Sequence, residues 1–458
     1  MNQLGVRWTA DQVLALAPDA ASRKAGSRLG TAGPWSDAGC DGEGALWGQC
    51  KGSGSRPYRT TVDLAGPSTA SRCSCPSRKF PCKHALGLLL LWAAEDAVVA
   101  GGAEPPEWAA EWIGDRRERT AKAAGGPPAE GSGEVPAQAT GTADPEAARR
   151  RAERREARIT SGATELEQRL ADLLRGGLAA AEQTGYGMWE ETAARMVDAQ
   201  APGLASRVRE LGSLPSSGAD WPVRLLEECA LLHLLDQAWL GRDRLPPALA
   251  TTVRTRVGLP SAPQGPPVRD RWLVLAQYDQ ADSKVTTRRI WLYGEESGRT
   301  ALVLSFGAAG RAPEVSLPVG LSVPAELLPH GGAGQLRATL GEQFAVPGPA
   351  AALPRGGSVT EAVEAYGRAL REDPWLEGRP VTLAAVIPVP GPDSWQLTDA
   401  EGKWALPVSS AALSGAGLWK LAALSGGAPV TVFGECTHRG FHPLTTWSLS
   451  APEPVPLV

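Results

Sequence analysis

The sequence lacks the motifs on which most well-known enzyme classes depend. It has no G-x₄-G-K-[ST] phosphate loop, no G-x-G-x-x-G after a strand-like segment, no G-x-S-x-G and no H-E-x-x-H. Only five histidines occur among 458 residues, so general acid–base groups are few. No set of carboxylates, or of Ser, His and Asp, stands out from the background. We therefore expect no enzymatic activity; an active site whose residues meet only in the fold is the alternative.

The sequence also lacks a membrane segment and a large excess of charge. The longest apolar run, Ala85–Ala94, covers about ten residues, half of what a helix needs to span a bilayer. The first residues, MNQLGVRWTADQ, do not show the basic and then apolar pattern of a signal peptide. The formal net charge of −4 gives the whole molecule no general attraction for nucleic acid or anionic membrane. We expect a cytoplasmic protein with no membrane partner.

Cysteine is unevenly distributed, because three of the seven cysteines fall within ten positions. Cys73, Cys75, Cys82 and His84 form C-x-C, six intervening residues and then C-x-H. Three thiols and an imidazole at this spacing supply the donors that a tetrahedral zinc ion takes. The good helix formers after Pro81 place the second pair in the first turn of a helix, where thiolate is favoured over thiol. The sequence predicts a Zn²⁺ ion on these four residues, and not a disulfide, because adjacent C-x-C cysteines bridge badly.

With four protein ligands, the predicted zinc site has no open position for water or substrate, so its role is structural. Three thiolates and a neutral imidazole leave the zinc complex with one net negative charge. No acidic residue lies between positions 72 and 84, and four basic residues offset that charge: Arg72, Arg78, Lys79 and Lys83. These four residues, the basic rim, are also candidates for binding nucleic-acid phosphates.

Three further groups of Cys and His have weaker spacing. They are Cys40 and Cys50; Cys229 and His233; and Cys436, His438 and His442. The first pair has no partner spacing, the second pair is four residues apart in a Leu-dense helix, and the third group lacks a fourth donor. We expect ordinary thiols, core residues and a turn, respectively, with a second metal site as the alternative in each case.

The segment CSCPSRKFPCKHALGLLLLW, preceded by strand-like segments, resembles the SWIM zinc finger of a family of bacterial proteins. WGQCKGSGSRPYRTTVDL before it, RMVDAQAPGLA at 195–205 and LAALSGG at 421–427 are also similar to that family. The resemblance implies a structural zinc and a role in binding proteins or DNA. It also implies a MoxR-type AAA+ ATPase or a von Willebrand A-domain protein as a partner.

The order of patterns along the chain predicts an α+β protein that starts with a SWIM-type zinc finger domain over residues 1–124. Strands at Ala45–Cys50 and Tyr58–Leu64 lead through a small antiparallel sheet to the C-x-C ligands. The helix that follows, Pro81–Val99, is apolar almost all round and must be covered on more than one side. A further helix is expected over Pro105–Ala124.

The middle of the chain is predicted to be all-helical. Residues 125–144 have almost no large apolar residue, which is typical of a disordered linker. Six Arg and two Glu follow between Arg149 and Arg158. We interpret this run as a salt-bridged helix start, with a phosphate-binding arm as the alternative. Leucines at three- and four-residue spacing then indicate amphipathic helices over the helical domain, residues 145–259.

Residues 268–458 are predicted to form a β-rich C-terminal domain. Short apolar segments separated by turn residues read as strands, among them LWKLAAL at 418–424. DAEGK at 399–403 predicts a hairpin, ECTHRGFH at 435–442 a turn, and Val359–Arg371 the one clear helix of this domain.

We therefore predict a zinc protein whose structural finger recognises protein partners, as an adaptor or regulator. The alternative is DNA binding through the basic rim, helped by the Arg149–Arg158 arm. The acidic net charge disfavours that alternative, although charge can be local.

Overall fold

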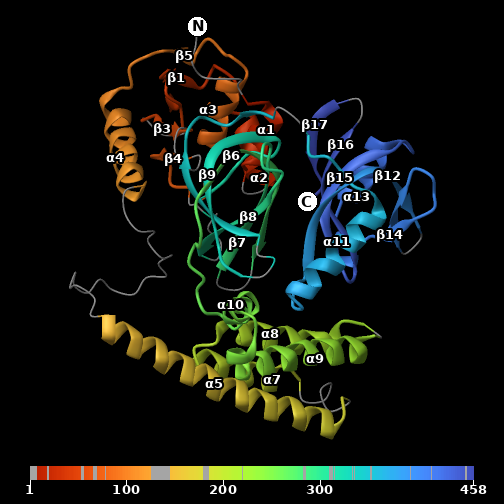
Figure 1. Ribbon diagram of the computed structural model, residues 1–458. Helices are drawn as coiled ribbons and strands as arrows, with labels where there is room; N and C mark the ends of the chain where they lie inside the picture. The colour runs from red at the N-terminus through yellow and green to blue at the C-terminus, as the bar shows by residue number, and fades with distance from the viewer. Residues whose placement is uncertain are drawn as a thin grey trace.

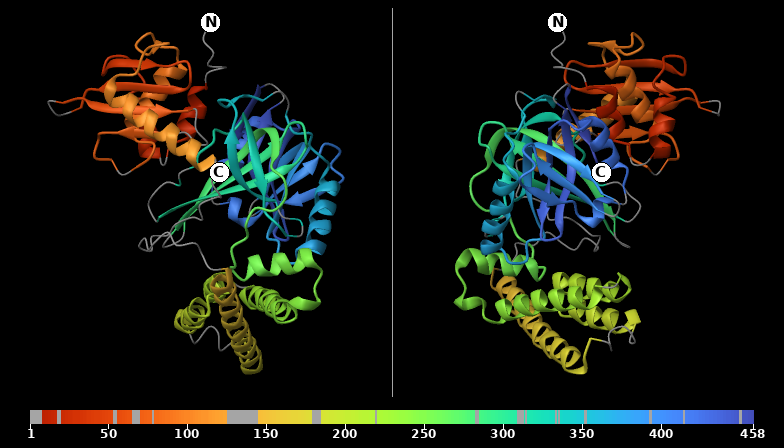
Figure 2. Two further views of the ribbon diagram at one scale, coloured as in Figure 1. Left: turned by 60° about the vertical axis from the view of Figure 1, so that its left-hand side comes forward. Right: turned by 90° about the vertical axis from the view of Figure 1, so that its right-hand side faces the viewer.

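The protein is described by a computed structural model. It covers residues 8–17, 20–52, 56–64, 70–77, 79–124, 145–178, 185–218, 220–281, 285–308, 313, 315–332, 334, 336–350, 353–391, 394–413, 415–448 and 451–458. A β-rich part lies in the centre, with the N-terminal part at one end and the helical part at the other (Figures 1 and 2). The predicted α+β organisation is thereby confirmed. The predicted linker at 125–144 lies outside the described residues.

The N-terminal part is a five-stranded sheet in the order β4-β3-β2-β1-β5. Its strands are β1 (Trp35–Cys40), β2 (Ala45–Cys50), β3 (Tyr58–Asp63), β4 (Ala70–Cys73) and β5 (Ala100–Gly101). Neighbouring strands are antiparallel except β1 and β5, which are parallel. The two predicted strands are confirmed as β2 and β3.

Helix α3 (Lys83–Ala93) lies at the centre of this part, between the sheet and two short helices, α1 (Ala10–Ala15) and α2 (Ala20–Ser27). All nine residues from His84 to Trp92 are buried. The expectation that this helix is covered on more than one side is confirmed. It ends earlier than predicted because Glu95 adopts a φ of 56°, which turns the chain out of the helix.

The helical part contains α5 (Pro145–Gly176), α7 (Gly185–Asp198), α8 (Pro202–Ser213), α9 (Trp221–Leu240) and α10 (Pro247–Arg256); α4 (Glu107–Ala124) precedes it. The basic run at Arg149–Arg158 lies inside α5, and Arg149 and Arg150 pair with Glu153 and Glu146 one turn away. The prediction of a salt-bridged helix start is confirmed.

The first sheet of the C-terminal part closes into a barrel. Its order is β10-β8-β7-β6-β9-β11, and β10 pairs with both β8 and β9. The β8–β10 pair is parallel and the β9–β10 pair is antiparallel. The strands are β6 (Val268–Ala281), β7 (Val285–Gly294), β8 (Thr300–Ala308), β9 (Leu321–Pro329), β10 (Arg337–Gln343) and β11 (Gly348–Pro349). We call β6–β10 the first barrel.

The second sheet, in the order β14-β13-β12-β15-β16-β17, repeats this connectivity. A parallel bridge from Val408, after β14, to Phe441 of β16 closes it. Its strands are β12 (Gly378–Pro390), β13 (Trp395–Asp399), β14 (Ala405–Pro407), β15 (Val430–Thr437), β16 (Gly440–Ser448) and β17 (Ala451–Pro456); its helices are α11 (Val359–Glu372), α12 (Ser410–Leu413) and α13 (Gly417–Ser425). We call β12–β16 the second barrel.

Two predictions in the C-terminal part are wrong. LWKLAAL is not a strand but helix α13, in which Leu418, Leu421 and Ser425 recur at helical spacing and are buried. ECTHRGFH is not one long turn. Gly440, with a φ of 109°, permits a tight connection between β15 and β16, so the flanking residues belong to strands. The DAEGK hairpin and the helix at 359–371 are confirmed.

The parts pack on one another through apolar side chains. The outer faces of β6, β7 and β8 bury Leu273, Leu275 and Trp291 against Phe433 and Trp447 of the second barrel. Leu321 of the first barrel joins the core of the N-terminal part. No helix of the described residues is long and apolar enough to cross a membrane.

Candidate metal centre

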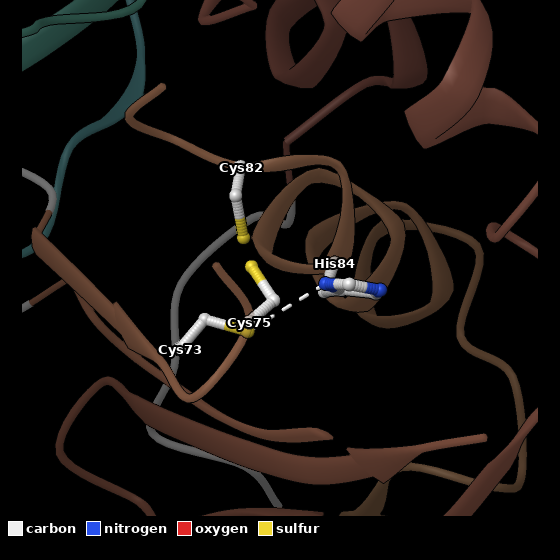
Figure 3. Close-up of side chains that lie close together, drawn as sticks. All are labelled: Cys73, Cys75, Cys82 and His84. Atoms are coloured by element: carbon white, nitrogen blue, oxygen red, sulfur yellow. Dashed lines mark hydrogen bonds between the residues drawn. The ribbon is translucent and has the colours of Figure 1, made fainter. Parts of the chain in front are cut away.

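Two neighbouring elements bring the four predicted ligands together. Cys73 ends β4, Cys75 lies two residues beyond it, Cys82 caps the N-terminus of α3, and His84 lies in its first turn. Their four ligand atoms all lie within 4.8 Å of one another (Figure 3). The local sequence explains this arrangement, because the antiparallel β3–β4 pair delivers the first two cysteines to the start of the helix.

The donor set fits a tetrahedral metal ion. Bond lengths of about 2.3 Å to sulfur and 2.0 Å to nitrogen require a sulfur–nitrogen separation of about 3.5 Å across a tetrahedron. The separation of Cys73 Sγ and His84 Nδ1 is 3.6 Å. Three sulfur donors and one imidazole, half-buried or buried, suggest zinc rather than magnesium or calcium, which prefer oxygen.

The three thiols of the cluster shift one another's pKa values. A hydrogen bond from Cys82 lowers the pKa of Cys73 to about 3, although burial opposes the shift. The same contact raises the pKa of Cys82, and burial raises that of Cys75. Cysteine binds a metal as the thiolate, so each thiol of the cluster must give up its proton to a bound metal. A metal that binds all three sulfurs must release those protons, so its affinity falls in acid.

Two side chains of β3, Thr60 and Tyr58, contact the predicted ligands Cys73 and His84. The Thr60 hydroxyl lies 3.2 Å from Cys73 Sγ, within hydrogen-bonding distance. The Tyr58 ring lies 4.8 Å from the His84 ring, centre to centre, and is tilted by 35°. Sequence reasoning missed both contacts. The alternation of polar and apolar residues in this strand indicated which residues share a face, but not which face meets the ligands.

The basic rim lies on the surface of this centre. Arg72, Lys79 and Lys83 are exposed, and Arg78 lies outside the described residues. Phe80, between the two lysines, has 45% of its surface exposed.

The other Cys and His groups form no metal site among the residues that the structure describes. Cys40, Cys50, Cys229 and Cys436 are buried, and none of the four is in a disulfide. The three histidines bond elsewhere: His233 to Glu167, His438 to Arg439 and His442 to Ser409. Burial, with the nearby Cys73, raises the pKa of Cys50 to about 11, which favours its thiol form. The expectation of ordinary thiols is consistent with these contacts.

Comparison with known families agrees with this geometry. Residues 58–93, which include all four ligands, match the SWIM zinc finger. The chain carries a SWIM finger. Residues 154–257 match the SWIM-associated four-helix bundle domain, so the helical part also has its counterpart in SWIM proteins. No curated protein and no solved structure matches the chain.

Proposed function

We propose that the SWIM finger holds one structural zinc ion through Cys73, Cys75, Cys82 and His84, and that it serves as a recognition module for a protein partner. Four protein ligands leave no coordination position for substrate, so the zinc has no catalytic role in this proposal. It joins β4 to α3 and fixes the loop between Cys75 and Cys82.

The burial of α3 carries this proposal. In DNA-reading zinc fingers the helix enters the major groove and its side chains contact bases. Here every residue from His84 to Trp92 is buried, so this helix has no face to offer DNA. What remains exposed is the ligand loop, where Phe80 projects between Lys79 and Lys83. An aromatic side chain inside a cationic rim is suited to a protein surface with an apolar pocket and acidic surroundings.

The partner we propose comes from the family resemblance. Bacterial SWIM proteins resemble components found alongside MoxR-type AAA+ ATPases and von Willebrand A-domain proteins, so the finger would act there as an adaptor or regulator. The test is capture from the native organism followed by mass spectrometry, with wild type and Phe80→Ala as baits. Loss of such a partner from the variant, with zinc content unchanged, supports the proposal. Equal capture by both baits contradicts it.

DNA binding through the basic rim is the second candidate, because Arg72, Lys79 and Lys83 are exposed. Each phosphate contact to duplex DNA contributes about −0.9 to the slope of log K against log[salt]. The four rim residues would then give a slope of about −3 to −4, and the double change Lys79→Ala, Lys83→Ala would make it shallower by about 2.

We expect that double change to leave DNA affinity unaltered, because the rim balances the negative zinc complex. The measurement is duplex binding across a salt series for wild type and the double variant. A micromolar or tighter complex at physiological salt that is lost in the variant would make nucleic acid the ligand of the finger.

A further inference from the structure

The two C-terminal barrels share one uncommon strand order. In each, the first strand pairs with the second and the fourth, the fourth pairs with the fifth, and the third lies parallel to the fifth. The first strand of each is also bulged where it changes partner, at Val274–Ala276 and at Leu383–Val386. This is the connectivity of the OB barrel, which binds oligonucleotides or oligosaccharides on the outer face of its second and third strands. Fold alone does not assign a ligand, so the residues of each face must decide.

The corresponding face of the first barrel is covered. Leu273, Trp291 and Leu302 are buried against β15 and β16 of the second barrel. The Trp291 indole donates a 2.9 Å hydrogen bond to the carboxylate of Glu435, and the Tyr278 hydroxyl donates one of 3.2 Å to the same oxygen. The first barrel therefore uses this face to hold the second.

The corresponding face of the second barrel is open. Gln396 of β13, Ala405 and Pro407 of β14 and Val389 of β12 are all exposed. These strands lie on the side of the second barrel away from the first (Figure 1). This face is therefore accessible to a ligand.

An exposed tryptophan lies near each end of β13. Of the sixteen tryptophans, all of them in described residues, only Trp404 and Trp419 are more than about a third exposed, at 60% and 68%. Trp404 follows the β13–β14 turn, and its carbonyl accepts a 2.9 Å hydrogen bond from Asp399, the last residue of β13. Trp419 lies on α13 with its ring 5.0 Å from that of Trp395, the first residue of β13. The strand between these two contacts, from Trp395 to Asp399, is about 13 Å long.

A lysine accompanies each exposed indole. Lys403 precedes Trp404 and Lys420 follows Trp419, and both lysines are exposed. The Lys420 ammonium donates one hydrogen bond to the carbonyl of Pro456, which holds it near the surface of the barrel. An indole face with a neighbouring cation is the pairing that single strands use, since bases stack on the ring and phosphates meet the charge. A neutral sugar needs the ring but not the cation.

We propose that the second barrel binds single-stranded nucleic acid across β13, with bases stacked on Trp404 and Trp419 and phosphates beside Lys403 and Lys420. This site is separate from the SWIM finger and does not depend on the function proposed for it. Only the second barrel can carry this site, because the same face of the first barrel is covered by the contact between the two barrels.

The test is fluorescence anisotropy of a labelled oligothymidylate of about 16 nucleotides, the upper end of an OB footprint, with the full chain at about 0.15 M salt. Trp404→Ala and Trp419→Ala should each weaken binding about 5- to 150-fold. Trp404→Phe should stay within a few fold of wild type because a phenyl ring still stacks. Lys403→Gln should make the salt slope shallower by about 0.7. Phe306→Ala, on an exposed ring of the first barrel, is the matched control and should change nothing.

Four results would overturn the proposal. The first two are no binding by wild type and binding by both tryptophan-to-alanine variants that equals that of wild type. The third is loss of binding only in the Lys79→Ala, Lys83→Ala finger variant. The fourth is Trp404-dependent binding of a labelled neutral oligosaccharide in place of the oligonucleotide. Failure of the Phe80 capture experiment leaves all of these measurements unaffected, so the two proposals fail separately.

Discussion

At the residue level, Cys82 lies both at the N-cap of α3 and in the candidate metal centre. It occupies the N-cap of α3, yet its side chain makes no capping hydrogen bond. Its sulfur instead lies among the other ligand atoms. Serine is among the best N-cap residues but a poor zinc ligand, so Cys82→Ser separates the two roles.

We expect Cys82→Ser to lose zinc and to loosen the N-terminal part, since structural zinc in finger peptides is worth about 10–16 kcal/mol. Elemental analysis and hydrogen exchange of α3 measure the two effects. Cys229→Ala removes a buried thiol from the helical part and should keep one zinc per chain. An unchanged zinc content in Cys82→Ser would show that the ligand assignment is wrong.

Asp236 is a buried carboxyl group that makes the stability of the helical part depend on pH. Its side chain is fully buried in α9, and neither carboxylate oxygen has a hydrogen-bond partner within the described residues. Burial, and then the charge of Glu167, raises the pKa of this carboxyl from 3.8 to about 9. The unfolded chain therefore gives up this proton at lower pH than the folded chain does.

The sign of the effect follows from linkage. The contribution of Asp236 to stability is complete below a pH of about 4 and is lost as the pH rises toward 9. We expect Asp236→Asn to remove this pH dependence. The free energy of unfolding of the variant minus that of wild type should therefore increase by a few kcal/mol between pH 5 and pH 8. Thermal unfolding at both pH values measures it. The exposed Asp198→Asn should shift neither transition; a similar pH dependence in Asp236→Asn and wild type would contradict the assignment.

At the level of elements, the loop after α11 anchors the second barrel to the helical part. Trp375 is 3% exposed and belongs to the core of the helical part, where its indole donates a 2.9 Å hydrogen bond to the carbonyl of Leu231. Two residues earlier, Asp373 pairs with Arg256 of α10 at 2.6 Å. The two parts therefore share a core residue and an ion pair.

Substitution at Trp375 tests this anchor. Trp375→Ala leaves a cavity in that core and should cost about 3–5 kcal/mol. Trp375→Phe keeps most of the packing, loses the hydrogen bond and should cost about 1 kcal/mol beyond the lost ring area. Calorimetry should show the helical part melting apart from the barrels in the alanine variant. One unchanged transition in that variant would mean that the contact is not an anchor.

At the level of the whole molecule, the composition of residues 125–144 leads to a prediction about proteolysis. This segment has almost no large apolar side chain with which to offset the entropy of ordering, so brief digestion should cut first between Gly125 and Ala143. The two products should stay folded, as judged by circular dichroism of the separated fragments. First cleavage inside Leu166–Leu178, which covers the C-terminal end of α5 and the two residues after it, would contradict this division of the chain.

Local sequence patterns were sufficient for the features that depend on near neighbours. The four candidate ligands lie within twelve positions, so their spacing alone indicated a metal centre. Helices α5 and α11 and the DAEGK hairpin follow from periodicity and turn chemistry over a few residues. The same reasoning failed for LWKLAAL, because a short apolar run fits a buried strand as well as a buried helix, and only its packing against the second barrel decides.

Only the tertiary structure determined how the barrels close and which surfaces remain. The parallel pairs that close them join Leu302 to Arg337 and Val408 to Phe441, contacts between distant segments that no local pattern encodes. Trp291 and Trp404 both stand in strand-like sequence, yet one is buried against the other barrel and one is exposed. A residue's type fixes what chemistry it can offer, whereas its accessibility depends on what the rest of the chain packs against it. The sequence therefore identified the candidate metal ligands, and the fold alone decided which aromatic residues stay exposed.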